Sequence, residues 1–221
     1  ARKRVLIQSR TQPTALLGKM LQSTPNQVET YISASGIGIY GDTGDTWLDE
    51  NAPSGNDFLA ECTRIWETAF GEVEQLPLRT AAIRIGIVLS PEGGAMAKIL
   101  LPFRFRIGAY FGKGRQWYSW IHIDDLCRLF IHALENPAIR GKYNAVAPQP
   151  VTNKEFTKTI GKVLGGLHLI ASVPSFLLRS GMGEMADAVL NSNRVSSKKI
   201  EASGFAFRFP ELEPALRDLL L

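Results

Sequence analysis

Two patterns of hydrophobic and polar positions alternate along this chain, one typical of strands and one typical of helices. Short apolar runs of strand length occupy residues 28–33, 79–89 and 143–147. Between and after them, apolar residues recur at helical spacing, which predicts helices at residues 4–21, 58–74, 95–101, 126–135, 155–164 and 211–221. From Leu169 onward the pattern is helical and punctuated by proline. Strands that alternate with helices are typical of an α/β protein with a parallel sheet.

Local residues refine the expected helix boundaries. Short polar side chains cap helix starts by accepting backbone N–H bonds. The expected caps are Asn56 or Asp57, Asp124 or His122, and Thr152, which precedes a glutamate at capping-box spacing. Pro13 falls inside the first helix, where its missing N–H predicts a kink or a restart near Thr11. The cluster Met182–Met185 is interpreted as packing.

One strand ends in small residues, which marks a binding edge. Residues 31–41 read YISASGIGIYG, so a β-branched run leads directly into Ser33, Ser35 and glycine. A buried parallel strand brings such hydroxyls and bare backbone to the carboxyl edge of an α/β sheet, where ligands bind. We expect an active or binding site there. No Gly-rich phosphate loop precedes this strand.

Composition and charge narrow the class of protein. The chain has 221 residues, 45% of them hydrophobic and 21% charged, as in globular proteins. Its formal charge of +4 is spread along the sequence, and no basic stripe interleaves with aromatics, so we expect no nucleic-acid partner. An anionic small molecule suits this balance. No apolar run approaches the ~20 residues of a membrane span, and we expect no membrane partner.

The two cysteines, Cys62 and Cys127, lie in predicted helices without metal-type spacing. Both are interpreted as reduced thiols in or near the core of a cytoplasmic protein. His122, Asp124 and Asp125 place an imidazole and two carboxylates within four positions. A metal site needs further ligands, and aspartate at a helix start is usually a cap. We therefore expect a structural role there and no metal.

Several motifs in a consistent order resemble the SDR39U1/YfcH-type epimerase family, whose members are atypical extended short-chain dehydrogenases/reductases. These motifs are ISASGIGIYGD, DFLAECTRIWE, RIGIVLSPEGGAM, LPFRFRIGAYFGKGRQWYSWIHIDDL, NAVAPQPVTNKEF and GEMADAVLNSNRVSSKKIEASGFAFRFPELEPALRDLL. The resemblance implies a Rossmann-like doubly wound parallel sheet that binds NADP or NAD, and a nucleotide-sugar-like small-molecule substrate. It also implies a preceding Gly-rich half of roughly 80 residues, absent from this chain.

The resemblance also implies a domain organisation. Residues 1–150 form the C-terminal part of the NAD(P)-binding Rossmann domain, with a substrate loop at 90–120, and residues 151–221 form a small mixed α/β lobe. The family-like catalytic pattern is incomplete. Extended relatives carry a Tyr-x-x-x-Lys pair on the helix after the strand end, but residues 58–63 read FLAECT. The remaining candidate catalytic residues are Ser35 and Tyr40; in the alternative interpretation Ser35 satisfies backbone groups and Tyr40 packs.

Further site residues follow from the resemblance. The implied cofactor residues are Arg10, Ser33, Ala34, Arg84, Gly86 and Val88. Arg10 is alternatively a surface helix residue, and residues 84–88 a plain core strand. Arg115 and Gln116, in a Gly-Lys-Gly-Arg-Gln loop, resemble a substrate-diphosphate grip, with a surface turn as the alternative. Two functions stay open: an NAD(P)-dependent epimerase, dehydratase or reductase, or a catalytically silent NADP(H)-binding sensor or partner-binding protein.

Overall fold

A parallel three-stranded sheet forms the centre of the computed structural model, which describes residues 2–221 without the side chains of Arg2, Met182, Glu184 and Met185. The sheet order is β1-β3-β8, with bounds Thr30–Gly36, Arg79–Ile85 and Gly141–Ala145. Strand β3 lies in the middle and all its residues up to Arg84 are buried, as its unbroken apolar pattern requires. The packing expected for Met182 and Met185 lies outside the described side chains.

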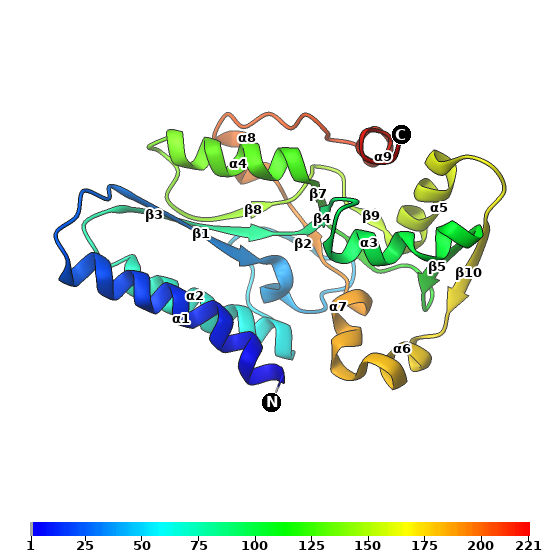
Figure 1. The fold of residues 1–221 in the computed structure, drawn as a ribbon, viewed down its shortest axis with the longest axis horizontal. Helices are drawn as coiled ribbons and strands as arrows, with labels where there is room; N and C mark the ends of the chain where they lie inside the picture. The colour runs from blue at the N-terminus through cyan, green and yellow to red at the C-terminus, as the bar shows by residue number, and fades with distance from the viewer. Residues whose placement is uncertain (1) are drawn as a thin grey trace.

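Helices cover both faces of this sheet (Figure 1). Helices α1 (Arg2–Ser23) and α2 (Phe58–Val73) lie on one face, and α4 (Ile123–Glu135) and α8 (Lys198–Ala202) lie on the other. A parallel sheet with helices on both faces is a Rossmann-like arrangement, which confirms the expected fold class. The core between the sheet and α4 is made by Ile83, Leu129, Ile139 and their neighbours.

Short strand pairs continue the fold beyond the carboxyl edge of the sheet. Strand β4 (Ile87–Leu89) pairs with β7 (Trp120–His122), and β2 (Trp47–Leu48) pairs with β11 (Arg194–Val195), both in parallel. Strand β6 (Trp117–Tyr118) pairs with β9 (Val151–Thr152) in antiparallel fashion. A 3₁₀ helix, η1 (Ile37–Tyr40), follows β1 directly. The last fifth of the chain thus returns to the first quarter.

A second packed region, which we call the lobe, lies at one end of the molecule (Figure 1). Its two strands, β5 (Ile107–Phe111) and β10 (Leu169–Val173), pair in parallel. Its other elements are α3 (Gly94–Leu100), η2 (Pro102–Phe105), α5 (Asn153–Leu164), α6 (Ser175–Met182), η3 (Gly183–Ala186), α7 (Asp187–Leu190) and α9 (Leu212–Leu220). Since both ranges on either side of residue 150 contribute to it, the domain division there stays a prediction.

Helix boundaries agree with the capping residues. Asp57 accepts a hydrogen bond from the Ala60 N–H at the start of α2, and Thr152 does the same for Glu155 in α5. Both caps confirm the sequence expectation. Helix α1, in contrast, runs without a break through Pro13, so the predicted restart is wrong. Proline removes only one hydrogen bond there, and the packing of α1 against α2 keeps the helix continuous.

Two other sequence interpretations need correction. Residues from Leu169 were expected to be helical, but Leu169–Val173 form strand β10, because pairing with β5 supplies backbone partners that local sequence does not reveal. Cys127 is exposed on α4, whereas Cys62 is buried as expected. Both thiols are free. Within residues 2–221, no helix combines the length and apolar character needed to cross a membrane.

Candidate functional site

The three central strands end at the same edge, and their last residues are in register. Ser35 lies beside Arg84, and Gly36 lies beside Ile85, which in turn pairs with Ala145 of β8. The carboxyl ends of parallel strands are where α/β proteins bind ligands. The predicted binding edge is therefore present as an arrangement of β1, β3 and β8.

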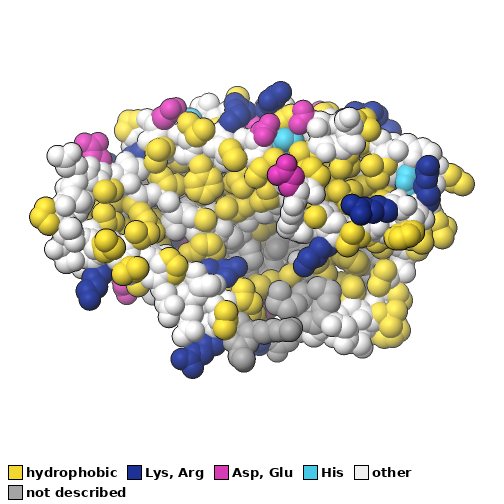
Figure 2. Space-filling view, viewed as in Figure 1, with side chains coloured by type: hydrophobic (Ala, Val, Ile, Leu, Met, Phe, Trp, Pro, Cys, Tyr) yellow, Lys and Arg dark blue, Asp and Glu magenta, His cyan; other side chains and the backbone are white. Residues whose placement is uncertain are grey.

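A cleft of about 200 Å³ opens at this edge. Apolar walls come from the strand ends and η1, and polar groups come from β6 and from the returning C-terminal segment. Its lining residues are Ile37, Gly38, Leu59, Ile85, Gly86, Ile87, Trp117, Tyr118, Ser119, Asp187, Ala188, Asn191 and Asn193. Figure 2 shows the face viewed in Figure 1 as hollowed near its centre, with basic side chains on either side of the hollow. Apolar walls with a few polar groups are the usual composition of a small-molecule site.

Beneath the cleft lies a buried ion pair that the sequence analysis did not find. Arg84 Nε donates to Glu67 Oε1 at 2.7 Å, and Arg84 Nη2 donates to Glu67 Oε2 at 2.9 Å. Lys142 Nζ approaches the same carboxylate at 3.0 Å, and Ser35 Oγ donates to it at 2.8 Å. Glu67 therefore joins β1, β3 and β8 to helix α2. We call these residues, with Tyr40 and Asn144, the edge network.

The electrostatics of the edge network follow from its burial. Burial alone raises the pKa of Glu67, but the hydrogen bonds and charge of Arg84 outweigh it and leave that pKa below its ordinary value. Burial alone would lower the pKa of Arg84, but the hydrogen bonds from Arg84 to Glu67 outweigh burial and raise that pKa. Both groups are therefore charged at neutral pH. The pair satisfies the requirement that a buried charge has a partner.

Tyr40 belongs to the same network. Its hydroxyl donates to Asn144 Oδ1 at 2.8 Å and accepts from Arg84 Nη1 at 2.9 Å. The side chain is 1% exposed, and burial raises its pKa, which the nearby Arg84 charge opposes without reversing. Ser35 is also buried, with its proton directed to Glu67. Both predicted catalytic hydroxyls thus lie at the edge, and both are engaged in internal hydrogen bonds.

The predicted cofactor residues fall into four places, one of which is the edge network that holds Arg84. Gly86 lines the cleft, where β3 meets β4. An added Cβ there would lie 2.5 Å from the Ser119 carbonyl oxygen, so glycine permits a close approach to the backbone between β6 and β7. Ser33 and Val88 lie inside parallel strands, with Ser33 Oγ donating to the Ala34 carbonyl. Arg10 lies on α1, where it donates to the Leu6 carbonyl and stacks over Trp66.

The two predicted substrate residues differ from each other. Arg115 is exposed on the loop between β5 and β6. Gln116 is half-buried, and its Nε2 donates to the Phe111 carbonyl and the Val189 carbonyl, both at 3.3 Å. Gln116 therefore ties the loop to α7, next to Asp187 and Asn191 of the cleft. No local pattern in the sequence marks Asn191 or Asn193, because they reach the cleft only through the β2–β11 pairing.

The returning segment is firmly held at the cleft. Ser192 accepts a bond from the Thr43 N–H through its carbonyl and donates through Oγ to the Gly44 carbonyl at 2.6 Å. Asn191 Nδ2 donates to Asp57 Oδ2 at 2.6 Å, and Asn193 Nδ2 donates to the Gly41 carbonyl. The loop after η1 and the segment before β11 therefore form one wall.

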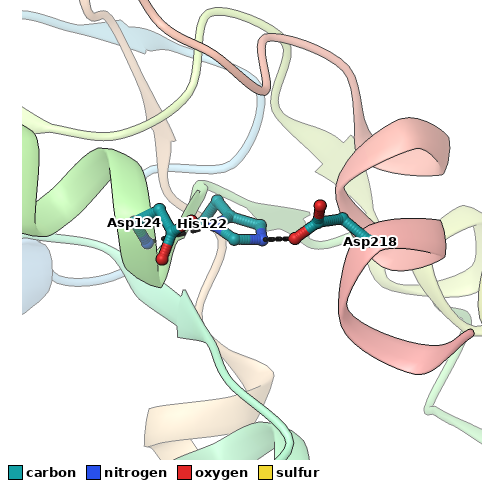
Figure 3. A group of neighbouring side chains, drawn as sticks. All are labelled: His122, Asp124 and Asp218. Carbon is teal, nitrogen blue, oxygen red and sulfur yellow. Dashed lines mark hydrogen bonds and ion pairs between the residues drawn. The ribbon is translucent and has the colours of Figure 1, made fainter.

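His122, Asp124 and Asp218 form a separate cluster away from the cleft (Figure 3). His122 Nδ1 accepts from the Asp124 N–H at 3.0 Å, which confirms His122 as the cap of α4, and its Nε2 lies 3.3 Å from Asp218 Oδ2 of α9. Since Nδ1 is an acceptor, the proton of the neutral ring is on Nε2. Neither nitrogen then offers a free lone pair, so the geometry favours a structural role over metal ligation.

Comparison with known proteins agrees with this architecture. Residues 71–146 match the NAD dependent epimerase/dehydratase family, and residues 173–219 match a domain of unknown function, DUF1731. The epimerase family protein YfhF of Bacillus subtilis is 36% identical over 219 residues, which is 99% of this chain and 72% of that protein.

Two solved structures are similar over nearly the whole chain. The human epimerase family protein SDR39U1, solved with NADPH, superposes with a TM-score of 0.91 at 34% identity, covering 96% of this chain and 72% of that one. A nucleoside-diphosphate sugar epimerase from Corynebacterium glutamicum has a TM-score of 0.80 at 36% identity, covering 99% of this chain and 43% of that one. The expectation drawn from the motifs is confirmed: the chain belongs to the epimerase family that includes YfhF and SDR39U1.

Proposed function

We propose that this chain forms the substrate-side part of an NADP(H)- or NAD(H)-dependent epimerase, dehydratase or reductase that acts on a nucleotide-linked sugar or another small polar molecule. The observation that carries this proposal is the cleft at the carboxyl edge of β1 and β3, in a chain so similar to a relative solved with NADPH. We also place the protein in the cytoplasm, which two free cysteines support.

The cleft fits one end of such a cofactor. Its volume of about 200 Å³ is below the range of sites that hold whole drug-sized ligands, so it suits a nicotinamide ring rather than a dinucleotide. The nicotinamide supplies hydride transfer. Pyrophosphate binding needs a Gly-rich turn at a helix N-terminus. We place that turn in the part of the relatives that lies outside the 72% of YfhF spanned here.

This chain's own residues have assigned roles in the proposal. Gly86 lines the ring-sized cleft, with Arg84, Ser33, Ala34 and Val88 in the strands that form its floor. Arg10, on α1, is assigned to the cofactor side. Ser35 and Tyr40 are the proposed catalytic hydroxyls, and Arg115 with Gln116 is the proposed substrate grip. Using either hydroxyl requires it to leave a hydrogen bond of the edge network.

The second candidate function is a catalytically silent NADP(H)-binding sensor. It is favoured by the start of helix α2, because residues 58–63 read FLAECT and contain neither the tyrosine nor the lysine of the Tyr-x-x-x-Lys pair of extended relatives. Positioned acid–base catalysis typically contributes 10²–10⁴-fold to a rate. In this second candidate function, the cleft binds the cofactor and the protein passes the signal on by binding a partner.

The test has a binding arm and a turnover arm. NADPH is titrated with this chain and with the protein extended to the length of YfhF, and binding is followed by nicotinamide fluorescence. Tight binding by the extended protein, without tight binding by this chain, supports the proposed division of the cofactor site. The extended protein is then incubated with NADPH and a panel of nucleotide-sugars, with products followed by mass spectrometry. Loss of turnover in Ser35→Ala or Tyr40→Phe supports the enzyme.

Each of the two substitutions, Ser35→Ala and Tyr40→Phe, has a matched control elsewhere in the chain. Ser54 is an exposed loop serine and Tyr31 a half-buried tyrosine near the start of β1, so Ser54→Ala and Tyr31→Phe should leave turnover unchanged. Turnover that survives both Ser35→Ala and Tyr40→Phe would place the chemistry elsewhere. NADPH binding without turnover on any substrate would favour the sensor.

A further inference from the structure

The lobe carries a surface that is both basic and apolar and that the proposed reaction does not use. We call it the lobe tip and define it by the residues Leu101, Arg104, Phe105, Arg106, Ile107, Leu167 and Leu169. All of them are exposed.

Strand pairing makes the lobe tip one continuous surface. Ile107 and Leu169 are partners in the β5–β10 register, and the Leu169 N–H donates to the Arg106 carbonyl at 2.9 Å. Arg106 Nη1 in turn reaches the Gly165 carbonyl at 3.4 Å, which holds the turn before Leu167 against the end of η2. Two segments about sixty residues apart therefore present their side chains together.

The apolar side chains at the lobe tip extend into solvent. Phe105 is 79% exposed, Leu167 is 92% exposed and Leu169 is 68% exposed. Single exposed apolar residues are common on protein surfaces, but contiguous groups of them mark interaction sites. Phe105 is the last residue of η2, Leu167 lies just before β10, and Leu169 is the first residue of β10.

The two segments that form the lobe tip carry basic residues only. Residues 93–123 and 156–183 contain no aspartate or glutamate, and they carry Lys98, Arg104, Arg106, Lys113, Arg115, Lys158, Lys162 and Arg179. Two of these pair with acidic residues from outside the segments, Lys162 with Glu213 and Arg179 with Asp187. Figure 2 shows basic and hydrophobic side chains together at the right-hand end, with no acidic side chain visible among them. Exposed arginine beside exposed phenylalanine and leucine is the combination found where proteins insert into the headgroup region of anionic membranes.

We propose that the lobe tip docks on an anionic lipid surface, with Phe105, Leu167 and Leu169 inserted among the acyl chains and Arg104 and Arg106 at the phosphates. A protein partner would need a complementary pocket for each protruding side chain, whereas a fluid lipid layer accommodates them without one. The docking is peripheral and needs no spanning helix. The sequence expectation of no membrane partner rested on spans alone, and the lobe tip arises only when β5 and β10 pair.

The experiment is sedimentation of this chain with vesicles of phosphatidylcholine, alone or mixed with phosphatidylglycerol, at low and high salt. We expect binding to the anionic vesicles only, weakened by salt because the attraction is screened. The double variant Phe105→Ser, Leu167→Ser and the charge reversal Arg104→Glu should each lower the partition coefficient about tenfold. All three residues are exposed, so the fold is expected to persist, which circular dichroism checks.

The matched control lies on α1 and α2, where Leu16 is 60% exposed and Arg64 is exposed. Leu16→Ser with Arg64→Glu should bind as the parent does. The proposal is overturned if the parent does not sediment with anionic vesicles, or if the lobe-tip and control variants lose binding equally. It is also overturned if the parent forms a dimer that Phe105→Ser dissociates while no vesicle is bound, because the surface would then join two copies of the chain.

Discussion

Three side chains of the edge network meet at Glu67, and each of them lies on a different strand. Its carboxylate accepts hydrogen bonds from Ser35 of β1 and Arg84 of β3 and pairs with Lys142 of β8. A buried ion pair of this kind adds little net stability when compared with a hydrophobic replacement, but breaking it leaves an unpaired buried charge. Glu67 therefore fixes the relative positions of the strand ends that form the cleft floor.

Removing the charge of Glu67 should be costly. We expect Glu67→Gln to lower the free energy of unfolding by about 3–5 kcal/mol, because Arg84 is left buried without a counter-charge. Urea unfolding followed by circular dichroism measures this. Glu213→Gln, at an exposed pair with Lys162 and Arg217, is the control and should change stability little. Equal losses in the two variants would contradict the account.

Arg115 allows a test of the substrate side at the same scale. Because its side chain is exposed, Arg115→Ala should leave the free energy of unfolding unchanged. If it grips a phosphate or carboxylate, binding of a nucleotide-sugar to the extended protein should weaken by about 1.5–3 kcal/mol. Calorimetric titration measures this, with Arg140→Ala as the exposed control. Unchanged affinity would remove Arg115 from the site.

At the scale of elements, α4 is held at both ends by groups distant in sequence. His122 caps its start, and Arg79 of β3 reaches its end, where Nη1 donates to the Ala133 carbonyl and Nη2 to the Leu134 carbonyl, both at 2.6 Å. The last carbonyls of a helix lack intrahelical partners and carry partial negative charge. A buried guanidinium is therefore stabilised there without a carboxylate.

We expect Arg79→Met to destabilise the protein by about 2–4 kcal/mol, since the carbonyls at the end of α4 lose a charged donor and stay buried. Chemical unfolding measures the loss, and hydrogen exchange should show faster opening in the last turn of α4 than in α2. Arg140→Met, an exposed arginine just after α4, serves as the control. No difference between the two variants would show that Arg79 is not a helix cap.

Elements with local signals could be predicted from the sequence. The caps Asp57 and Thr152 and the amphipathic helix α9 needed only neighbouring residues. Strand β10 could not be predicted, because its partner β5 lies far away in the chain and pairing decided its conformation. Glu67 was missed for a similar reason: a glutamate in a helix resembles a solvated residue until Arg84 is placed beside it.

For the whole molecule, α9 connects the lobe to the end of the central fold. It packs against α5 through Leu212, Ala215 and Leu216, and Asp218 meets His122 at the junction of β7 and α4. His122 is buried and its ring stacks on Phe209 at 4.0 Å. Burial lowers the pKa of His122, and the carboxylates of Asp124, Asp218 and Asp125 oppose this effect without reversing it.

Stability should therefore depend on pH through His122. Because the folded pKa lies below the value in the unfolded chain, the unfolded state binds the proton more readily. The contribution of His122 to the free energy of unfolding is then fully present above the unfolded pKa of about 6.5. It is lost as the pH falls from there through the folded pKa. Thermal unfolding at pH 7.5 and 5.5 measures the slope, which His122→Asn should flatten and His132→Asn should not. An unchanged slope in His122→Asn would assign the dependence to another group.

The return of residues 191–195 to the loop at 41–48 also bears on how the molecule is made. The loop that follows η1 obtains its backbone partners, including Ser192 and Val195, only after about 150 further residues have been joined. During synthesis the central sheet can assemble from β1, β3 and β8 well before that point. The wall of the cleft is therefore completed only after all three strands of the central sheet have been made, so a nascent chain can hold the sheet before it holds the pocket.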